Sequence, residues 1–372
     1  MRKKSFFRPI LLLLSILALA GLLMAEFAPF AQGEKYWFIA LAGLAYPYLL
    51  LLNVLLMCYW LYHIKWYFLL HFLLIFFGRQ SFKQTFALNA YAAERPSSLQ
   101  KAIPLKIMSY NVRNFDLYNW KENKASREAM FDFIKKENPD ILCLQEFYTE
   151  DGESADFQNI KAVINELGYT DYHFERTSTY KKTHHFGLAT FSKLPIVGKN
   201  KLQLTQTERN LAIETIVAVA PNKEISIWNT HLQSLRFAPE DYEYIENIGT
   251  NTTLEGSKNI VRKLRIGFQK RSQQAERLRN ALDNTTRPFI VCGDFNDTPN
   301  SYAYSHISAS LQDAFLKAGG WGIGSTYNGP IPALRIDYIL ADSTFQVQNF
   351  ERHLFYFSDH LPITADLMLG GK

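Results

Sequence analysis

Hydrophobic residues are distributed in two different ways along this chain, and the change comes near residue 100. Before it, long uncharged apolar runs follow one another, the clearest being Ile10–Ala25 and Tyr36–Tyr62. After it, short apolar runs of strand length alternate with stretches in which apolar residues recur at helical spacing. The first pattern predicts membrane-spanning helices, and the second predicts a folded α/β or α+β domain.

Residues 1–86 are predicted to form an all-helical transmembrane anchor of two or three spans. Ile10–Ala25 exceeds the usual core of a signal peptide and is followed by a second apolar run, which favours an anchor over a cleaved signal. Tyr36–Tyr62 is the strongest candidate, because it is long enough to cross a bilayer with some tilt. Ile64–Phe86 has a short apolar part and would span only if Arg79 and Lys83 reached the interface.

The polar stretch 87–103 is predicted to be a linker that holds the following domain close to the membrane. The basic N-terminus should stay in the cytoplasm. Two spans would then leave the domain on the cytoplasmic side, and three would place it outside. The charge pattern alone does not choose between them.

Charge also separates the two parts. Residues 1–100 contain nine Lys/Arg and three Asp/Glu, a net charge of +6, whereas the remainder contains 31 and 32, a net charge of about −1. A nearly neutral domain lacks the basic footprint of a nonspecific nucleic-acid binder. Cys143 and Cys292 lie in apolar, strand-like runs, so neither a disulfide nor a metal cluster is expected.

The domain over 104–372 is predicted from alternating strands and helices. Phe237–Ser257 is polar and is expected to be a long loop or insertion. Lys258–Asn284 has the pattern of a long basic helix, whose charged face we expect to be solvated rather than bound to phosphate or lipid headgroups. The other predicted helices are Ser126–Asn138 and Asp156–Leu167, and the predicted strands are Leu105–Asn111, Ile141–Glu146, Tyr169–Glu175, Phe186–Phe191, Leu211–Ala220 and Glu224–His231.

Short motifs place polar residues at the ends of the apolar strands, where side chains can converge on a common cleft. In chain order they are Met-Ser-Tyr-Asn-Val ending at Val112, Leu-Gln-Glu at Glu146, Trp-Asn-Thr-His-Leu at Leu232, Gly-Asp-Phe-Asn-Asp at Asp297, Arg-Ile-Asp-Tyr-Ile at Ile339 and Ser-Asp-His-Leu-Pro at Pro362. Each motif is weak alone. Together and in this order they resemble the endonuclease/exonuclease/phosphatase superfamily over nearly all of 104–370, in a membrane-anchored bacterial layout.

The resemblance implies a four-layer α/β (α+β) sandwich, in which two packed, mainly antiparallel β-sheets are flanked by helices. It also implies divalent-metal-dependent cleavage of phosphate esters. Glu146 is the first candidate metal ligand, with Asn111 and Asp359 as further ligands. Carboxylate and amide oxygens suit Mg²⁺ or Mn²⁺, and the His/Cys set of a zinc site is missing.

The resemblance assigns the remaining chemistry to residues that handle protons and phosphate oxygens. His360 would act as a general base or orient the phosphate, with Asp337 accepting its other ring N–H. Asp294 would position or deprotonate the attacking water. Asn296 and His231 would donate hydrogen bonds to the phosphoryl group, where charge builds in the transition state.

Other residues of these motifs are candidates for supporting roles. Asn229 would support the catalytic histidine two positions later on its strand. Arg113 stands where abasic-site endonucleases carry an acidic residue, and could clamp a phosphate or lie in a surface loop. His185 and Ser234 could line the cleft and bind substrate.

The sequence therefore predicts a multi-pass membrane protein with a tethered phosphoesterase that hydrolyses phosphate mono- or diesters. An anchor would raise the effective concentration of a lipid-linked substrate such as a phospholipid or polyprenyl phosphate. The alternatives are a membrane-held DNA or RNA nuclease and a catalytically silent binding module. Similarity to three-span relatives favours an extracytoplasmic domain, and no obligate protein partner is inferred.

Overall fold

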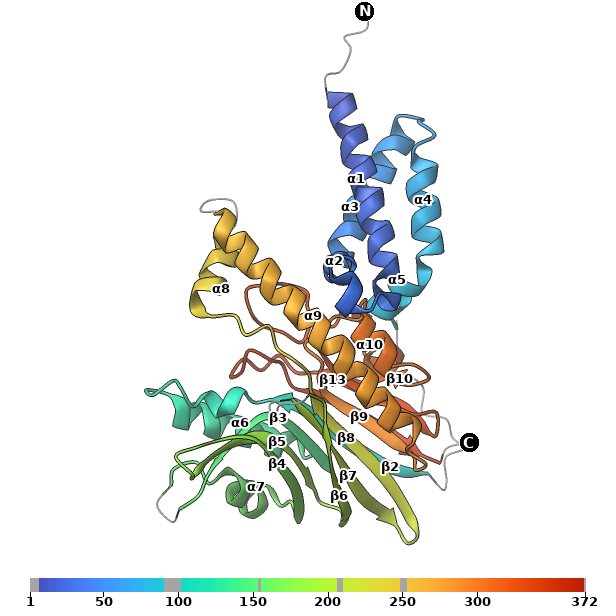
Figure 1. Cartoon of the computed structure of the whole chain (residues 1–372). Coiled ribbons are helices and arrows are strands. Elements are labelled where there is room, and N and C mark those ends of the chain that lie inside the picture. Colours follow the sequence, from blue (N-terminus) through green and yellow to red (C-terminus); the bar gives the residue numbers. More distant parts are fainter. Residues whose placement is uncertain (1–6, 90–101, 153–154, 206–209, 248–252, 371–372) are drawn as a thin grey trace, which may run out of the picture.

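Five helices form a column that stands on a body of two β-sheets (Figure 1). The structure is a computed structural model that describes residues 7–89, 102–152, 155–205, 210–247 and 253–370. The basic N-terminal cluster and most of the predicted linker lie outside the described residues. The helices of the column are α1 (Phe7–Phe27), α2 (Gly33–Leu44), α3 (Tyr46–Tyr62), α4 (Phe68–Phe77) and α5 (Arg79–Thr85).

The predicted span Tyr36–Tyr62 is not one continuous helix. The chain bends by 55° between α2 and α3. The bend comes just before Pro47, which sits in the first turn of α3 and lacks the N–H that a continuing helix would need. By length and composition, one helix, Phe7–Phe30, can cross a membrane alone, and there are up to two spans if the bent pair is one of them.

Buried polar groups join the upright helices of the column. Asn53 of α3 donates hydrogen bonds to the carbonyl oxygens of Ala18 (2.9 Å) and Leu49 (2.8 Å), and its Oδ1 lies 2.8 Å from Nδ1 of His71 on α4. A buried polar group is costly unless it is paired, so these bonds favour one packing of α1, α3 and α4.

The domain that follows the helical column contains two mixed sheets of six strands each. Most neighbouring strands are antiparallel, but β2–β3 and β8–β9 are parallel pairs. The first sheet has the order β13 (Phe345–Arg352), β14 (Ile363–Leu369), β2 (Ile103–Asn111), β3 (Ile141–Glu150), β5 (His184–Ser192) and β4 (Asp171–Tyr180). The second has the order β10 (Gln312–Asp313), β12 (Asp337–Ala341), β9 (Phe289–Asp294), β8 (Lys223–His231), β7 (Leu211–Ala220) and β6 (Ile196–Gln203).

The sheets pack face to face, and helices cover their outer faces, which confirms the predicted four-layer sandwich. Side chains such as Ile107, Ile227 and Ile339 fill the space between the sheets, together with the free cysteines Cys143 and Cys292. The first sheet is covered by α6 (Asn123–Glu137) and α7 (Asn159–Leu167), and the second by α9 (Leu254–Asp283) and α10 (Tyr302–Ile307). Shorter elements are η1 (Ala28–Phe30), η2 (Arg113–Asp116), α8 (Pro239–Glu246), α11 (Ala314–Ala318), β1 (Ala87–Leu88) and β11 (Trp321–Gly322).

The structure differs from the sequence pattern in two details of the polar segment before α9. Phe237–Ser257 is not all loop, because α8 forms within it, with proline in its first turn and Asp241 capping the Ala238 backbone N–H at 2.6 Å. The long helix also begins earlier than predicted, at Leu254, because the Thr253 side chain caps it. Residues 248–252, between the two helices, lie outside the described part.

Candidate active site

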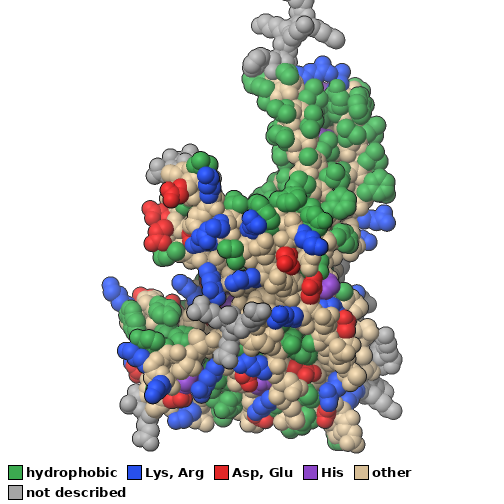
Figure 2. All heavy atoms as spheres, in the orientation of Figure 1, with side chains coloured by type: hydrophobic (Ala, Val, Ile, Leu, Met, Phe, Trp, Pro, Cys, Tyr) green, Lys and Arg blue, Asp and Glu red, His purple; other side chains and the backbone are tan. Residues whose placement is uncertain are grey.

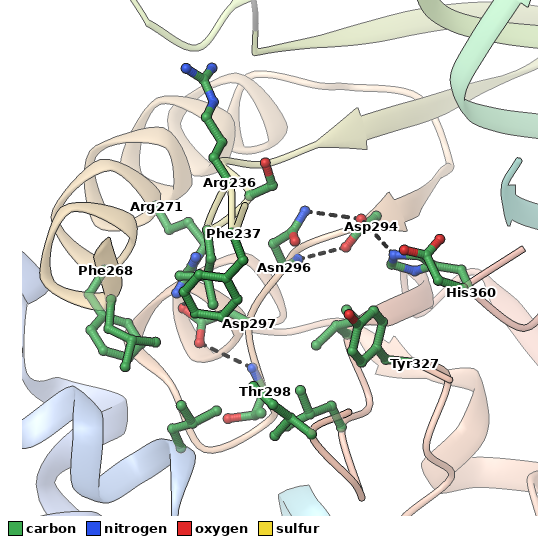
Figure 3. Close-up of a pocket in the computed structure, with 18 of the residues that line it drawn as sticks. Arg236, Phe237, Phe268, Arg271, Asp294, Asn296, Asp297, Thr298, Tyr327 and His360 are labelled. Atoms are coloured by element: carbon green, nitrogen blue, oxygen red, sulfur yellow. Dashed lines mark hydrogen bonds and ion pairs between the residues drawn. The ribbon is translucent and has the colours of Figure 1, made fainter. Parts of the chain in front are cut away.

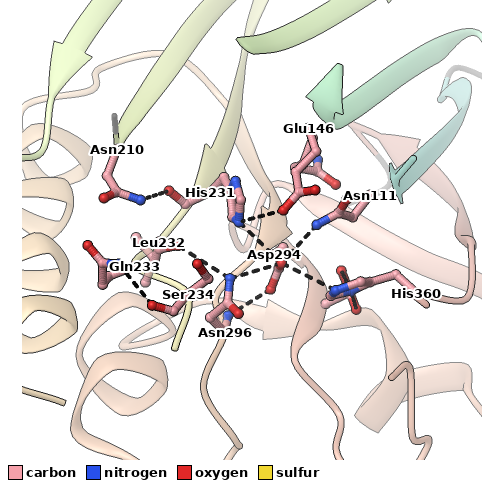
Figure 4. Close-up of polar contacts among 12 residues, drawn as sticks. Asn111, Glu146, Asn210, His231, Leu232, Gln233, Ser234, Asp294, Asn296 and His360 are labelled. Carbon is pink, nitrogen blue, oxygen red and sulfur yellow. Dashed lines mark hydrogen bonds and ion pairs between the residues drawn. The ribbon is translucent and has the colours of Figure 1, made fainter. Parts of the chain in front are cut away.

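Polar residues from both sheets meet at one edge of the sandwich. Asn111 ends β2, His231 ends β8 and Asp294 ends β9, while Asp337 begins β12 and is the antiparallel partner of Asp294. The carboxyl ends of the parallel pairs bring their last residues to the same edge. Figure 4 shows Asn111, His231, Glu146 and His360 around the carboxylate of Asp294.

Asp294 is the centre of this cluster and is only 1% exposed. Its carboxylate accepts hydrogen bonds from Asn111 Nδ2 (3.1 Å), the backbone N–H of Asn296 (2.8 Å) and Asn296 Nδ2 (3.0 Å). The Nε2 atoms of His231 and His360 lie 3.5 and 3.7 Å from Asp294 Oδ2. The preceding residue must be glycine, because Gly293 has φ +141° and a Cβ there would stand 1.9 Å from the carbonyl oxygen of Thr230.

His360 and Asp337 form a buried pair. His360 Nδ1 lies 2.9 and 3.1 Å from the two carboxylate oxygens of Asp337, and the edge of the Tyr327 ring packs near the imidazole. Burial by itself lowers the pKa of His360, but the negative charges of Asp337 and Asp294 outweigh it and hold that pKa well above its usual value. The pair therefore fixes the imidazole with Nε2 toward Asp294.

Glu146 reaches the cleft through a backbone irregularity. Its φ is +48°, and the pairing of β3 with β5 shifts register between Leu144 and Phe147. A positive φ at a residue other than glycine is strained, and such strain is typical of functional sites. The Glu146 carboxylate is half-exposed, and its ion-pair contact within the described chain is His231 Nε2 at 3.9 Å.

The donor set fits a hard divalent cation. Glu146 and Asp359 line the same cleft. Among the described residues, the ion-pair contact of Glu146 is with His231 at 3.9 Å, and Asp359 has no ion-pair contact within 4.0 Å. Asn111 also has an amide oxygen nearby, which accepts the backbone N–H of Arg113 at 3.1 Å. Oxygen-rich sets of this kind suit Mg²⁺ or Mn²⁺.

A second group, Asp294, Asp337 and His360, has ligand atoms within 4.8 Å of one another. Both oxygens of Asp337 already contact His360 Nδ1, so an ion bound there would compete with the histidine for the carboxylate. This group is therefore able to handle protons, and Glu146 and Asp359 form a separate pair of carboxylates in the same cleft.

The other predicted site residues lie in different surroundings. Ser234 lines the cleft. Asn229 is fully buried beneath it and joins the sheets, accepting from Gln145 Nε2 (2.8 Å) and donating to the carbonyl oxygen of Ala189 (2.9 Å). Arg113 is exposed on η2, outside the cleft lining, and His185 is a buried partner of Asp151 (2.7 Å), also outside it.

Two further cleft residues, Arg271 and Tyr327, carry no local sequence signal of a site. Arg271 was read as part of a solvated helix face, yet it is 2% exposed, and its Nε donates to Asp297 Oδ2 at 3.0 Å. Its Nη1 donates to the carbonyl oxygen of Gln233 at 3.0 Å. Tyr327 also lines the cleft, and its sequence surroundings gave no signal.

The cleft has a volume of ≈ 200 Å³, and its two ends differ in polarity. The catalytic cluster occupies one end, and apolar side chains occupy the other. Figure 3 shows Phe268 on the side opposite His360, with Phe237 and the Arg271–Asp297 pair between them. The lining residues are Leu44, Glu146, Ser234, Leu235, Arg236, Phe237, Tyr242, Leu264, Phe268, Arg271, Asp294, Asn296, Asp297, Thr298, Tyr327, Ile331, Leu334, Ile336, Asp359 and His360.

Comparisons with known proteins agree with this geometry. A family model described as "Endonuclease/Exonuclease/phosphatase family" matches residues 108–360. A second model, described as a domain of unknown function, matches residues 8–85.

Similar proteins include nocturnin from Rattus norvegicus, 24% identical over 238 residues, which cover 56% of this chain and 46% of that protein. A DNA-(apurinic or apyrimidinic site) endonuclease from Dictyostelium discoideum is 26% identical over 219 residues, covering 59% of this chain and 48% of that protein. The chain thus spans about half the length of the curated relatives it matches. The crystal structure of an endonuclease/exonuclease/phosphatase from Bacteroides vulgatus has a TM-score of 0.53 at 20% identity, covering 72% of this chain and 99% of that one, which supports the fold alone.

Proposed function

This chain belongs to the Endonuclease/Exonuclease/phosphatase family, and from that premise we propose that it is a magnesium-dependent phosphoesterase tethered at a membrane. Members of the family are divalent-metal-dependent hydrolases that act on phosphoester bonds. The observation that carries the proposal is the cluster around Asp294, where His231, His360 and Asn296 surround one buried carboxylate at the end of a cleft.

The proposed cation is Mg²⁺ or Mn²⁺, held by Glu146 and Asp359 with the amide oxygen of Asn111. When bound, such an ion supplies positive charge that polarises a phosphoryl oxygen. Glu146 also contributes rigidity, because its strained backbone is fixed by strand pairing on both sides of the bulge.

The residues around Asp294 position the nucleophile and the phosphate. Asn111 and Asn296 hold the Asp294 carboxylate, which orients the attacking water and takes its proton. His231 Nε2 has no hydrogen-bond partner among the described residues and is free to donate to a phosphoryl oxygen. His360, fixed by Asp337, presents its Nε2 to the same space.

The tether is the second part of the proposal. Figure 2 shows hydrophobic side chains over most of the visible surface of the column. In Figure 1 the N-terminal end lies at the far end of the column from the sheets, and α1, α3 and α4 stand side by side. We propose an anchor that leaves the catalytic body outside the cytoplasm, because a basic N-terminus held inside would put the other end of α1, where Ala25 accepts a hydrogen bond from Asn300, on the outer side. A lipid-linked phosphoester is the substrate class that such a tether favours.

Purified full-length protein in detergent would test the function. We expect phosphate or alcohol release from lipid phosphoesters in Mg²⁺ or Mn²⁺, loss of turnover in a chelator, and loss in Asp294→Asn. Parallel panels of single- and double-stranded nucleic acid separate the lipid hydrolase from a nuclease. Metal-independent turnover, or ligand binding without any turnover, would refute the proposal.

Sidedness needs a separate measurement. A reporter that is active only outside the cytoplasm, fused after Lys372, should be active. If the reporter is inactive in cells that contain the full-length fusion, the catalytic body lies in the cytoplasm and the proposed orientation is wrong.

A further inference from the structure

Away from Asp294, the cleft is lined by many apolar side chains, beside the mutually paired Arg271 and Asp297. These apolar side chains are mostly half-buried, so they leave hydrophobic surface facing the open space: Leu44, Leu235, Phe237, Leu264, Phe268, Ile331 and Leu334. A cleft that held a polar alcohol next to the phosphate would need hydrogen-bond donors and acceptors there. Exposed apolar surface in a concave site instead favours an apolar part of a ligand.

One of these residues, Leu44, comes from the helical column. It is the last residue of α2, and α2 is fixed to the catalytic body. The backbone N–H of Gly33 donates to Ser272 Oγ on α9 at 2.8 Å, and Asn300 Nδ2 donates to the carbonyl oxygen of Ala25 at 2.9 Å. A Cβ at Gly43 would stand only 2.5 Å from the carbonyl oxygen of Asn300. Leu44 is therefore held in the wall of the cleft by close, specific packing.

The apolar lining continues beneath the column. A second, smaller cavity lies between α2, α3 and the loops of the catalytic body, and it shares Leu44, Thr298 and Leu334 with the main cleft. Its remaining lining residues are Gly43, Pro47, Tyr48, Thr85, Pro299, Asn300, Ile323 and Ala333. Hydrophobic side chains thus run from the base of the column to the catalytic cluster.

We propose that the column is part of the substrate-binding site, with Leu44 of α2 and Leu264 of α9 holding the hydrocarbon chain of a membrane lipid whose phosphate ester lies at Asp294. This inference rests on the proposed phosphoesterase function and deepens it. The polar end binds the phosphate, and the apolar end excludes water from the first carbons of the chain. The anchor then selects the substrate as well as tethering the enzyme.

The test measures how turnover by the full-length protein depends on chain length. Ethyl, butyl, octyl and dodecyl phosphates, and their p-nitrophenyl diesters, are presented in the same mixed micelles with Mg²⁺. We expect kcat/KM to rise with chain length, by at most about fourfold per methylene that becomes buried. Phospholipid in nanodiscs of fixed composition then shows whether the lipid is taken from a bilayer.

Three variants test whether the dependence on chain length comes from Leu44 of α2 and Leu264 of α9. Leu44→Gln and Leu264→Gln should each lower the dodecyl-to-ethyl ratio of kcat/KM, on the order of five- to tenfold. Leu41→Gln is the matched control, because Leu41 lies on the same helix at similar burial but outside the cleft lining, and it should leave the ratio unchanged. Thermal unfolding of each variant shows whether the fold is retained.

The outcomes separate the two proposals. If no ester of the series is cleaved in Mg²⁺ or Mn²⁺, the phosphoesterase function itself fails. If esters are cleaved but chain length has no effect, or if folded Leu44→Gln and Leu264→Gln proteins keep the wild-type ratio, the function stands and the lipid-chain inference is overturned. Cleavage of micellar esters without cleavage of bilayer lipid would overturn the membrane source of the chain.

Discussion

Replacing Asp337 by Asn separates the catalytic use of the His360 pair from its contribution to the fold. Asp337 is 3% exposed, and both its oxygens lie within 3.1 Å of His360 Nδ1. Asparagine has almost the same shape, but it removes the negative charge and can turn its NH₂ toward the imidazole. His360 would lose its fixed orientation and its stabilised charged form, so we expect kcat to fall about 10²- to 10⁴-fold with little change in KM.

The same substitution should also cost stability, on the order of 3 kcal/mol, because removing one partner of a buried ion pair leaves the charge of His360 uncompensated. Asp342→Asn, just beyond the other end of β12, is the matched control. Asp342 Oδ2 accepts the backbone N–H of Phe289 at 2.6 Å, so this variant should lose about 1 kcal/mol of stability and keep its kcat. Steady-state kinetics at saturating Mg²⁺ and thermal unfolding measure both. A folded Asp337→Asn protein with more than about a tenth of wild-type kcat would refute the catalytic role.

Three further predictions concern the metal, pH and the column. Glu146→Gln should raise the Mg²⁺ concentration for half-maximal rate by on the order of tenfold, and an unchanged midpoint would exclude Glu146 as a ligand. Burial lowers the pKa of His173 from 6.5 to about 4. As pH falls, His173 therefore takes up a proton in the unfolded chain before it does so in the folded protein. Stability should be full above pH 6.5 and drop by up to about 3 kcal/mol toward pH 4, a slope that His173→Gln should lack in denaturant titrations. Deleting residues 1–100 removes carbonyl acceptors from Asn300 and Arg335, so the remaining domain should unfold at a lower temperature than the full chain; an equal temperature would show that the packing contributes no stability.

Much of the fold and the central residues of the site were predictable because their signals are local. A short apolar run that ends in Asn111, His231 or Asp294 is visible in the sequence, and the sheet brings such ends together. The pairing of Asp337 with His360 was not visible in this way. It joins Asp337 at the start of β12 to His360, 23 positions later in the segment before β14, and only the resemblance to the family suggested it.

Other features depend on contacts that no local pattern records. Arg271 belongs to a helix rich in basic residues, and nothing in that helix reveals that Asp297 packs against this one position. Glu146 needs a bulge with positive φ, although its sequence resembles an ordinary strand end. The break between α2 and α3 follows from Pro47, but an apolar run on both sides concealed it.

The packing of α2 against the catalytic body shows that an apolar segment can have a role besides that of an anchor. Apolar residues avoid water, but lipid and protein satisfy them equally, so composition cannot name the partner. In α2 the small residues Ala40 and Gly43 are buried, whereas the large residues Tyr36 and Phe38 are 48% and 47% exposed. The small side chains allow close approach to the catalytic body, and the large ones are exposed on the surface of the column. Because this helix ends at Leu44 in the cleft lining, α2 contributes to the wall of the site as well as to the helical column.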